Sequence, residues 1–233
     1  MVIGRITAAL AAASALAALG WSVAVRAGAT ETKPPSGAKA TLRELKPGFA
    51  ALDLSESVNG DAITDVSDRE ESDFDAWGQS FPAEDLPESG LFEPKGANTA
   101  FLFPTKDRGK KNNVVCVKQT LALSGKAREL HFLAATTDGE QEEKLTIVYA
   151  DGEATTDFKV PDWCQTPQFG AKEGVASAHR IAAGCGGGRG HGKETRTIRI
   201  FVVSIAVGPE RELKSLKLPN NPFIHIFAIT LVK

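Results

Sequence analysis

The chain has 233 residues, a hydrophobic content of 42% and a formal net charge of −2. The predicted N-terminal signal segment contains Arg5 and Arg26 and no acidic residue, so its removal leaves 25 of the 27 basic residues against 29 acidic ones. This mildly acidic balance gives no reason to expect nucleic acid or an anionic lipid surface as a partner.

Residues 1–29 have the layout of a secretory signal peptide. Arg5 precedes an apolar and small-residue run from Ile6 to Gly20, and small residues follow at Ala27 and Ala29. The run is shorter than the roughly 20 residues of a membrane span. Its extension through Val25 leaves an uncleaved N-terminal anchor as the alternative. We expect cleavage, and therefore a secreted protein in the periplasm, at the cell surface or in the medium.

The segment that follows predicts a tether and then one folded domain. Residues 30–41 are rich in Pro, Gly, Ser and Thr and lack apolar periodicity, which is typical of a flexible linker. Residues 42–233 are long enough for a single domain with a core that needs no disulfide or metal to be stable.

From Leu42 onward apolar residues alternate with a period of two, and helix signals are scarce. Eight strands are predicted: residues 49–55, 99–103, 113–123, 129–136, 143–150, 153–160, 196–207 and 223–232. This number of strands, with long connections and two nearly apolar strands near the C-terminus, predicts an all-β jelly roll or β-sandwich of two antiparallel sheets.

One hairpin is predicted in register. Asp151 and Gly152 suit the two positive-φ positions of a type I′ turn. With these residues at the centre, the core-facing pairs are expected to be Tyr149 with Ala154, Ile147 with Thr156, and Leu145 with Phe158.

Six phrases in order carry a family resemblance: "ALDLSESVNGDAITD", "FDAWGQSFPAEDLP", "VVCVKQTLAL", "LHFLAATTDG", "TIVYADG" with "PDWC", and "HIFAITL". Together they span roughly residues 49–231. Over this span the chain resembles a galactose-binding-domain-like β-sandwich module, of the kind appended to secreted bacterial glycoside hydrolases. The resemblance implies a jelly-roll sandwich, a noncatalytic role and contact with carbohydrate. It does not identify a sugar, because function resides in loops grafted on the fold.

An acidic run begins in the first predicted strand, residues 49–55, and continues into the connection that follows it. Residues 53–75 contain nine acidic residues and one basic residue, Arg69. A calcium ion takes 6–8 oxygen ligands and relieves such crowding, so one reading is a structural calcium site formed by Asp53, Asn59, Asp61 and Asp65. The other reading is a solvated loop, which is the usual fate of a charge run.

Ligand-binding candidates gather around the two tryptophans that follow the signal segment. An aromatic ring offers a flat face to a pyranose while nearby charged groups bind its hydroxyls. We therefore assign the candidate set to Trp77, Asp75, Trp163, Asp162 and Arg180. For Trp163 the alternative is a buried plug at the sandwich edge, with Asp162 accepting backbone hydrogen bonds at the corner. For Trp77 the alternatives are core and groove.

The glycine-rich segment 184–195, "GCGGGRGHGKET", does not meet the requirements of a phosphate-binding loop, because Glu194 occupies the cation-ligand position and a strand follows. For an exported chain we expect a disulfide between Cys164 and Cys185 that closes this loop. Cys116, inside a predicted strand, is expected to be buried and unpaired.

No catalytic motif emerges, because neither a G-x-S-x-G elbow nor an H-E-x-x-H pair is present. The sequence therefore predicts a secreted noncatalytic binding module for carbohydrate or cell-wall glycan. A cell-surface structural or adhesion protein with a protein partner is the alternative, and a cryptic hydrolase is the second alternative.

Overall fold

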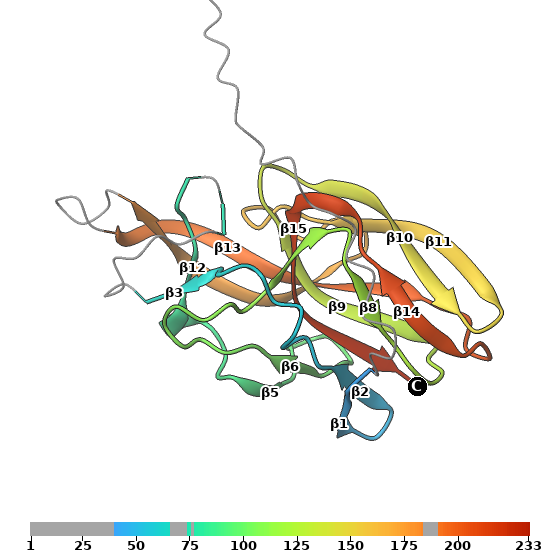
Figure 1. Ribbon diagram of the computed structural model, residues 1–233. Helices are drawn as coiled ribbons and strands as arrows, with labels where there is room; N and C mark the ends of the chain where they lie inside the picture. The colour runs from blue at the N-terminus through green and yellow to red at the C-terminus, as the bar shows by residue number, and fades with distance from the viewer. Residues whose placement is uncertain (1–39, 66–73, 76, 184–190) are drawn as a thin grey trace, which may run out of the picture.

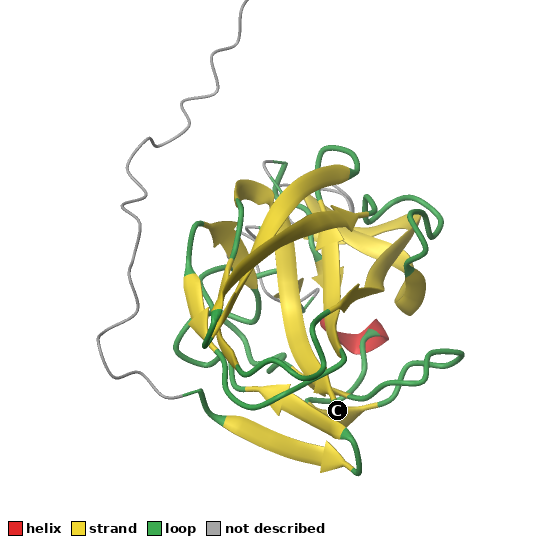
Figure 2. Cartoon of the chain, turned by 90° about the vertical axis from the view of Figure 1, so that its right-hand side faces the viewer, coloured by secondary structure: helices red, strands yellow, loops and turns green. Residues whose placement is uncertain are grey.

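The computed structural model describes residues 40–65, 74–75, 77–183 and 191–233, and nearly all regular structure in them is β-strand (Figures 1 and 2). The predicted signal peptide and residues 30–39 of the tether lie outside the described residues, so these two assignments stay predictions. Within the described ranges, no helix has the length and hydropathy that crossing a bilayer requires.

Two antiparallel sheets pack face to face, which confirms the predicted β-sandwich. The larger sheet has the order β1-β2-β15-β9-β13-β12, and β7 also pairs with β15. Its strands are β1 (Leu42–Lys46), β2 (Phe49–Leu52), β7 (Val114–Val117), β9 (Glu129–Thr136), β12 (Lys172–Ala183), β13 (His191–Ala206) and β15 (Asn220–Val232). The smaller sheet has the order β11-β10-β14-β8. Its strands are β8 (Thr120–Ala122), β10 (Gln141–Tyr149), β11 (Gly152–Val160) and β14 (Leu213–Lys217).

A third layer covers the outer face of the larger sheet. It consists of loops with short strands, namely β3 (Ile63–Thr64), β4 (Phe81–Pro82), β5 (Gly90–Phe92) and β6 (Phe101–Phe103), and the 3₁₀ helix η1 (Ala83–Asp85). In Figure 1 this layer lies on the opposite side of β15 and β9 from β10, β11 and β14.

Alternating residues of the central strands therefore enter two different cores. On β9, Leu130 and Phe132 pack toward the smaller sheet, whereas Leu133 and Ala135 pack toward the loop layer. Strand β15 has a bulge between Ile226 and Ala228, which places both Phe227 and Ala228 in the outer core. Burial on both faces explains why these strands are almost continuously apolar.

Most of the predicted strands are present with small differences in their bounds. The predicted strand 129–136 is confirmed as β9. The predicted strand 113–123 is instead two strands, β7 and β8, because Lys118 has a positive φ of 66° and ends the first. Strands β12 and β14 were not predicted: β12 is rich in small residues and β14 is short, so both give weak apolar alternation.

The predicted register of the β10–β11 hairpin is wrong by two residues. Tyr149 pairs with Gly152 and Leu145 pairs with Thr156, so Ala150 and Asp151 form the turn. The positive φ falls on Gly152 alone, at 140°, and the Arg211 side chain binds the Asp151 carboxylate. A shift of two preserves the side-chain alternation, and Leu145, Tyr149 and Phe158 are all in the core between the sheets.

The segment after β2 is fixed to the segment before β7 by a close backbone approach at Gly60. The amide of Gly60 donates to the carbonyl oxygen of Asn113, 3.1 Å away, and the Asn112 amide donates to the Gly60 carbonyl oxygen at 2.9 Å. A Cβ atom at residue 60 would lie 2.7 Å from both Oδ1 of Asn113 and Cγ2 of Val115. The crossing therefore requires glycine for steric reasons, at a residue whose φ is not positive.

Replacement of Gly60 by Ala should lower the free energy of unfolding by about 2–4 kcal/mol, because a methyl group there overpacks a buried contact. Gly96→Ala is the matched control: its φ is 76° and a Cβ atom there meets nothing within 4 Å, so about 1 kcal/mol is expected from backbone conformation alone. Urea denaturation followed by circular dichroism measures both. Equal losses in the two variants would contradict the steric account.

Candidate ligand-binding surface

Trp163 and Asp162 form a structural corner after β11. The Trp163 side chain is 3% exposed, and its ring packs edge-on against Phe74 and Phe81 with centroids 4.8 and 5.3 Å away. Asp162 accepts hydrogen bonds from the amides of Cys164 (2.8 Å) and Gly139 (3.0 Å) through its two oxygens. These contacts confirm the alternative reading of a buried plug and a hydrogen-bonded corner. The assignment of both residues to a ligand-binding set is corrected, because the ring and the carboxylate are already occupied by the protein.

Trp77 is the opposite case, since its side chain is 76% exposed. Asp75 fixes the turn that carries it: Oδ1 accepts hydrogen bonds from the amides of Trp77 (2.9 Å) and Gln79 (2.8 Å). Phe74, immediately before this turn, is anchored in the outer core. The exposed ring is thus carried by a turn that is anchored by the burial of Phe74 before it and by the hydrogen bond from the Gln79 amide after it.

Arg180 on β12 links this turn to the Trp163 corner. Its guanidinium carbon lies 5.8 Å from the centroid of the Trp163 ring, and Nε donates to Oε2 of Glu194 at 2.6 Å. Burial raises the pKa of Asp75, although its two amide donors and the positive charge of Arg180 act in the other direction. The structure therefore places Asp75 and Trp77 of the predicted set on one turn, and Arg180 near enough to Asp75 for its charge to act on that carboxyl group.

Three of the four residues predicted to bind calcium hydrogen-bond to other parts of the protein. Asp53 accepts from the amide of Ser55 (2.9 Å), and Asp61 accepts from the Asn112 side chain (2.7 Å). Asn59 hydrogen-bonds to the backbone of Val115 through both the nitrogen and the oxygen of its side-chain amide, and Asp65 is exposed.

Among the described residues, no group of three or more His, Cys, Asp or Glu side chains is placed to hold a metal ion. Two of the four, Asn59 and Asp61, contact the chain segments that meet at Gly60, and the calcium assignment stays a prediction. Residues 66–73 of the acidic run lie outside the described residues.

The cysteines differ in their surroundings. Cys116 is fully buried, as predicted, and burial raises the pKa of its thiol well above the ordinary value. Cys164 is partly exposed, and burial together with Asp162 raises the pKa of its thiol. Cys185 lies outside the described residues, so the disulfide with Cys164 stays a prediction.

Thiol titration tests that disulfide. If it forms, the purified exported protein should show one thiol, that of Cys116, and this thiol should react only after denaturation because it is buried. Of the three cysteines in the chain, all should react in denaturant after reduction. Three thiols without reduction would contradict the predicted pairing.

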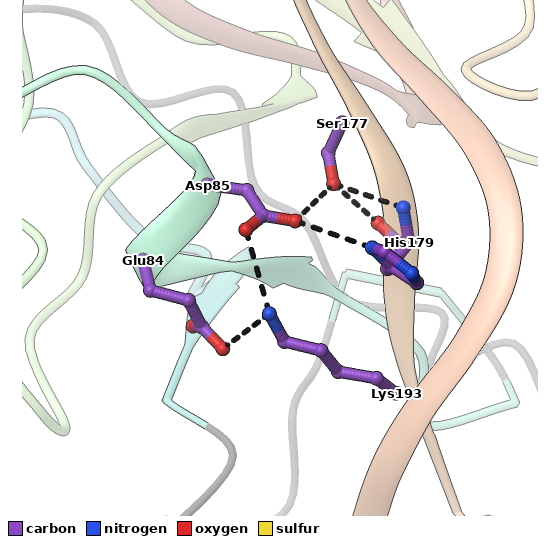
Figure 3. Close-up of polar contacts among 5 residues, drawn as sticks. All are labelled: Glu84, Asp85, Ser177, His179 and Lys193. Carbon is purple, nitrogen blue, oxygen red and sulfur yellow. Dashed lines mark hydrogen bonds and ion pairs between the residues drawn. The ribbon is translucent and has the colours of Figure 1, made fainter.

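A second polar cluster, which the sequence did not predict, joins η1 to the β12–β13 hairpin (Figure 3). Ser177 Oγ lies 2.6 Å from Oδ2 of Asp85 and 2.7 Å from the carbonyl oxygen of His179. Lys193 pairs with Glu84 at 2.8 Å and with Asp85 at 3.4 Å. Asp85 is 92 positions from Ser177 and 108 from Lys193 in the chain, so no local motif signals the cluster.

The cluster contains Ser, His and Asp, but in the wrong order for nucleophilic catalysis. In a catalytic triad the imidazole lies between the hydroxyl and the carboxylate. Here the carboxylate of Asp85 bonds the Ser177 hydroxyl directly, and Nδ1 of His179 is 3.7 Å from Oδ2 of Asp85, beyond hydrogen-bond range. The Ser177 hydroxyl donates a charge-assisted hydrogen bond to the Asp85 carboxylate. The arrangement acts as a clamp between layers.

Replacing Asp85 by Asn should lower the free energy of unfolding at pH 7 by about 1–2 kcal/mol, through loss of the hydrogen bond to Ser177 and the pairing with Lys193. Burial alone would raise the pKa of Asp85, but Ser177 and Lys193 outweigh it, and the pKa lies below its ordinary value of 3.8. A carboxyl group whose pKa is lowered by folding stabilises the folded state fully at pH values above its ordinary pKa. This stabilisation is lost as the pH falls through the lowered pKa of the folded state.

The stability difference between wild type and Asp85→Asn should therefore shrink between pH 7 and about pH 3. Paired urea titrations at the two pH values measure it. Lys214→Gln, an exposed change on the smaller sheet, serves as the control and should show no such dependence. A constant difference across this range would contradict the role of the ionised carboxylate.

A comparison with known families places this architecture. The family described as AziU2-like beta-sandwich domain matches residues 49–233, from the first residue of β2 to the end of the chain. No curated protein sequence matches significantly. The family match covers most of the chain and agrees with the two packed antiparallel sheets. The chain belongs to the AziU2-like β-sandwich domain family.

Proposed function

We propose that this chain is an exported, noncatalytic binding module that recognises a carbohydrate, such as a cell-wall glycan, at the surface formed by Trp77, Asp75 and Arg180. The observation that carries the proposal is the exposure of Trp77: of the two tryptophans in the predicted mature chain, one is a buried plug and the other is 76% exposed. A large ring exposed to water costs hydration free energy, which contact with the C–H face of a sugar recovers.

Asp75, two residues before the ring, and Arg180, whose charge acts on Asp75, suit the polar part of the same task. Asp75 supplies carboxylate oxygens that accept hydrogen bonds from hydroxyl groups, and the planar guanidinium of Arg180 carries five N–H donors. Among the described residues its hydrogen bond to Glu194 uses Nε. A ring for stacking, an acceptor and a donor on fixed backbone are the components that orient a ligand without reacting with it.

The resemblance to galactose-binding-domain-like modules points in the same direction. Its ordered phrases are similar to galactose-binding-like modules of secreted glycoside hydrolases, and one of these phrases contains both Asp75 and Trp77. Export by the predicted signal peptide would deliver the module to the compartment where cell-wall glycans are found. The inverted order of Asp85, Ser177 and His179 supports a noncatalytic role over the hydrolase alternative.

Trp77→Ala should weaken binding of any glycan recognised on an array or by titration calorimetry at least about tenfold, because stacked aromatic anchors dominate small binding surfaces. Leu91→Ala removes another exposed apolar side chain and is the matched control, with no change expected. Because Trp163 is buried, acrylamide quenching of tryptophan fluorescence reports mainly Trp77, and a bound glycan should protect it. Full affinity in Trp77→Ala, or no glycan bound by the folded wild type, would reject the proposal.

A further inference from the structure

A cavity of about 710 Å³ lies between the edge of the larger sheet and the loop layer. It is lined by residues from β1, β2, β5, β6 and β15 and from the loops after β2 and before β7. This volume falls within the roughly 300–1,000 Å³ that small-molecule sites occupy. The cavity shares no residue with the Trp77 surface.

The floor of this cavity is apolar. Phe227 and Ala228, which the β15 bulge turns to the same side, contribute to it together with Leu102 and Phe103 of β6. Leu54 and Val58 line it from the loop after β2. An apolar surface of this kind favours a ligand with a hydrocarbon or aromatic body.

The walls of the cavity are preformed. The loop after β2 is joined to the segment before β7 by the backbone bonds at Gly60. The side chain of Asn112, which itself lines the cavity, accepts from the amide of Ala62 (2.9 Å) and donates to Asp61 (2.7 Å). A fixed wall keeps the cavity open without the ligand and reduces the entropy that binding must overcome.

The rim is positively charged, although the whole chain is mildly acidic. Arg43, Lys110 and Lys111 line the cavity with one acidic residue, Asp53. Within the described ranges, the structure gives the exposed side chains of Arg43 and Lys110 no ion-pair partner. Two cations with no ion-pair partner among the described residues, beside an apolar floor, complement an anionic group attached to an apolar body.

We propose that this cavity binds a small amphipathic anion, with its apolar body against Phe227 and Leu102 and its carboxylate, sulfonate or phosphate group at Arg43 and Lys110. Binding at this site is separate from glycan recognition at Trp77, so either activity can be present without the other.

The probe is 8-anilino-1-naphthalenesulfonate, whose fluorescence rises on transfer to an apolar site, and the matched neutral probe is N-phenyl-1-naphthylamine, the same ring system without the sulfonate. Arg43→Gln combined with Lys110→Gln should weaken binding of the sulfonate about tenfold and leave the neutral probe unchanged. Raising NaCl from about 20 mM to about 500 mM should weaken the sulfonate selectively. Lys214→Gln is the charge control and should change neither probe.

Leu102→Trp, which fills the cavity, should abolish binding of both probes at one equivalent, with the melting temperature measured in parallel. The double glutamine variant changes only exposed side chains, so the charge test holds even if Leu102→Trp does not fold. Equal binding of the sulfonate by wild type and the double variant would reject the anionic ligand class. Undiminished binding in a folded Leu102→Trp protein would reject the cavity as the site. Loss of glycan binding in Trp77→Ala with sulfonate binding intact is the expected result for two independent sites.

Discussion

Burial of the larger sheet on both faces is the constraint on which the rest of the structure depends. Strands β9, β13 and β15 carry apolar side chains on alternate positions toward both sides, so a two-layer sandwich alone would leave one of these faces in water. The loops between β2 and β7 cover that face with Phe74, Phe81, Phe101 and Phe103. Each large side chain buried in this way contributes about 1.5–3 kcal/mol, which compensates for ordering long connections that have little regular structure.

The polar features of the protein lie where this covering layer meets the sheet. Backbone groups in irregular loops need partners when they approach a core, and Asp75, Asn59 and Asn112 supply them. The clamp of Asp85, Ser177 and Lys193 does the same for η1. Most of the charged and amide side chains that attract attention in the sequence are therefore explained by attachment of the loops, and this explanation includes two of those assigned to calcium.

Once these structural roles are assigned, two surfaces of the described part of the chain carry the proposals. At one edge Trp77 projects from a turn that Asp75 holds, and at another the apolar cavity opens beneath Arg43 and Lys110. They differ in chemistry, because the first offers a flat ring with hydrogen-bonding groups and the second an open apolar cavity with positive charge at its rim. In both proposals the sandwich supplies a rigid frame and the irregular loops supply the contact regions, because function in such folds resides in loops grafted on the frame.

The sequence by itself determined the all-β class, the central strands such as β9, and the burial of Cys116, because alternation of apolar residues is a local property that a period of two makes visible. For Trp163 and Asp162 it offered two readings, a ligand-binding pair and a buried plug with a hydrogen-bonded corner, and the burial of the ring decided for the second. Only the tertiary structure decided the hairpin register, the exposure of Trp77, the use of Asn59 and Asp61 as pins, and the meeting of Asp85 with Ser177. These depend on contacts between segments tens of residues apart, where a shift of two residues or a single crossing at Gly60 changes the partners without changing the pattern of the sequence.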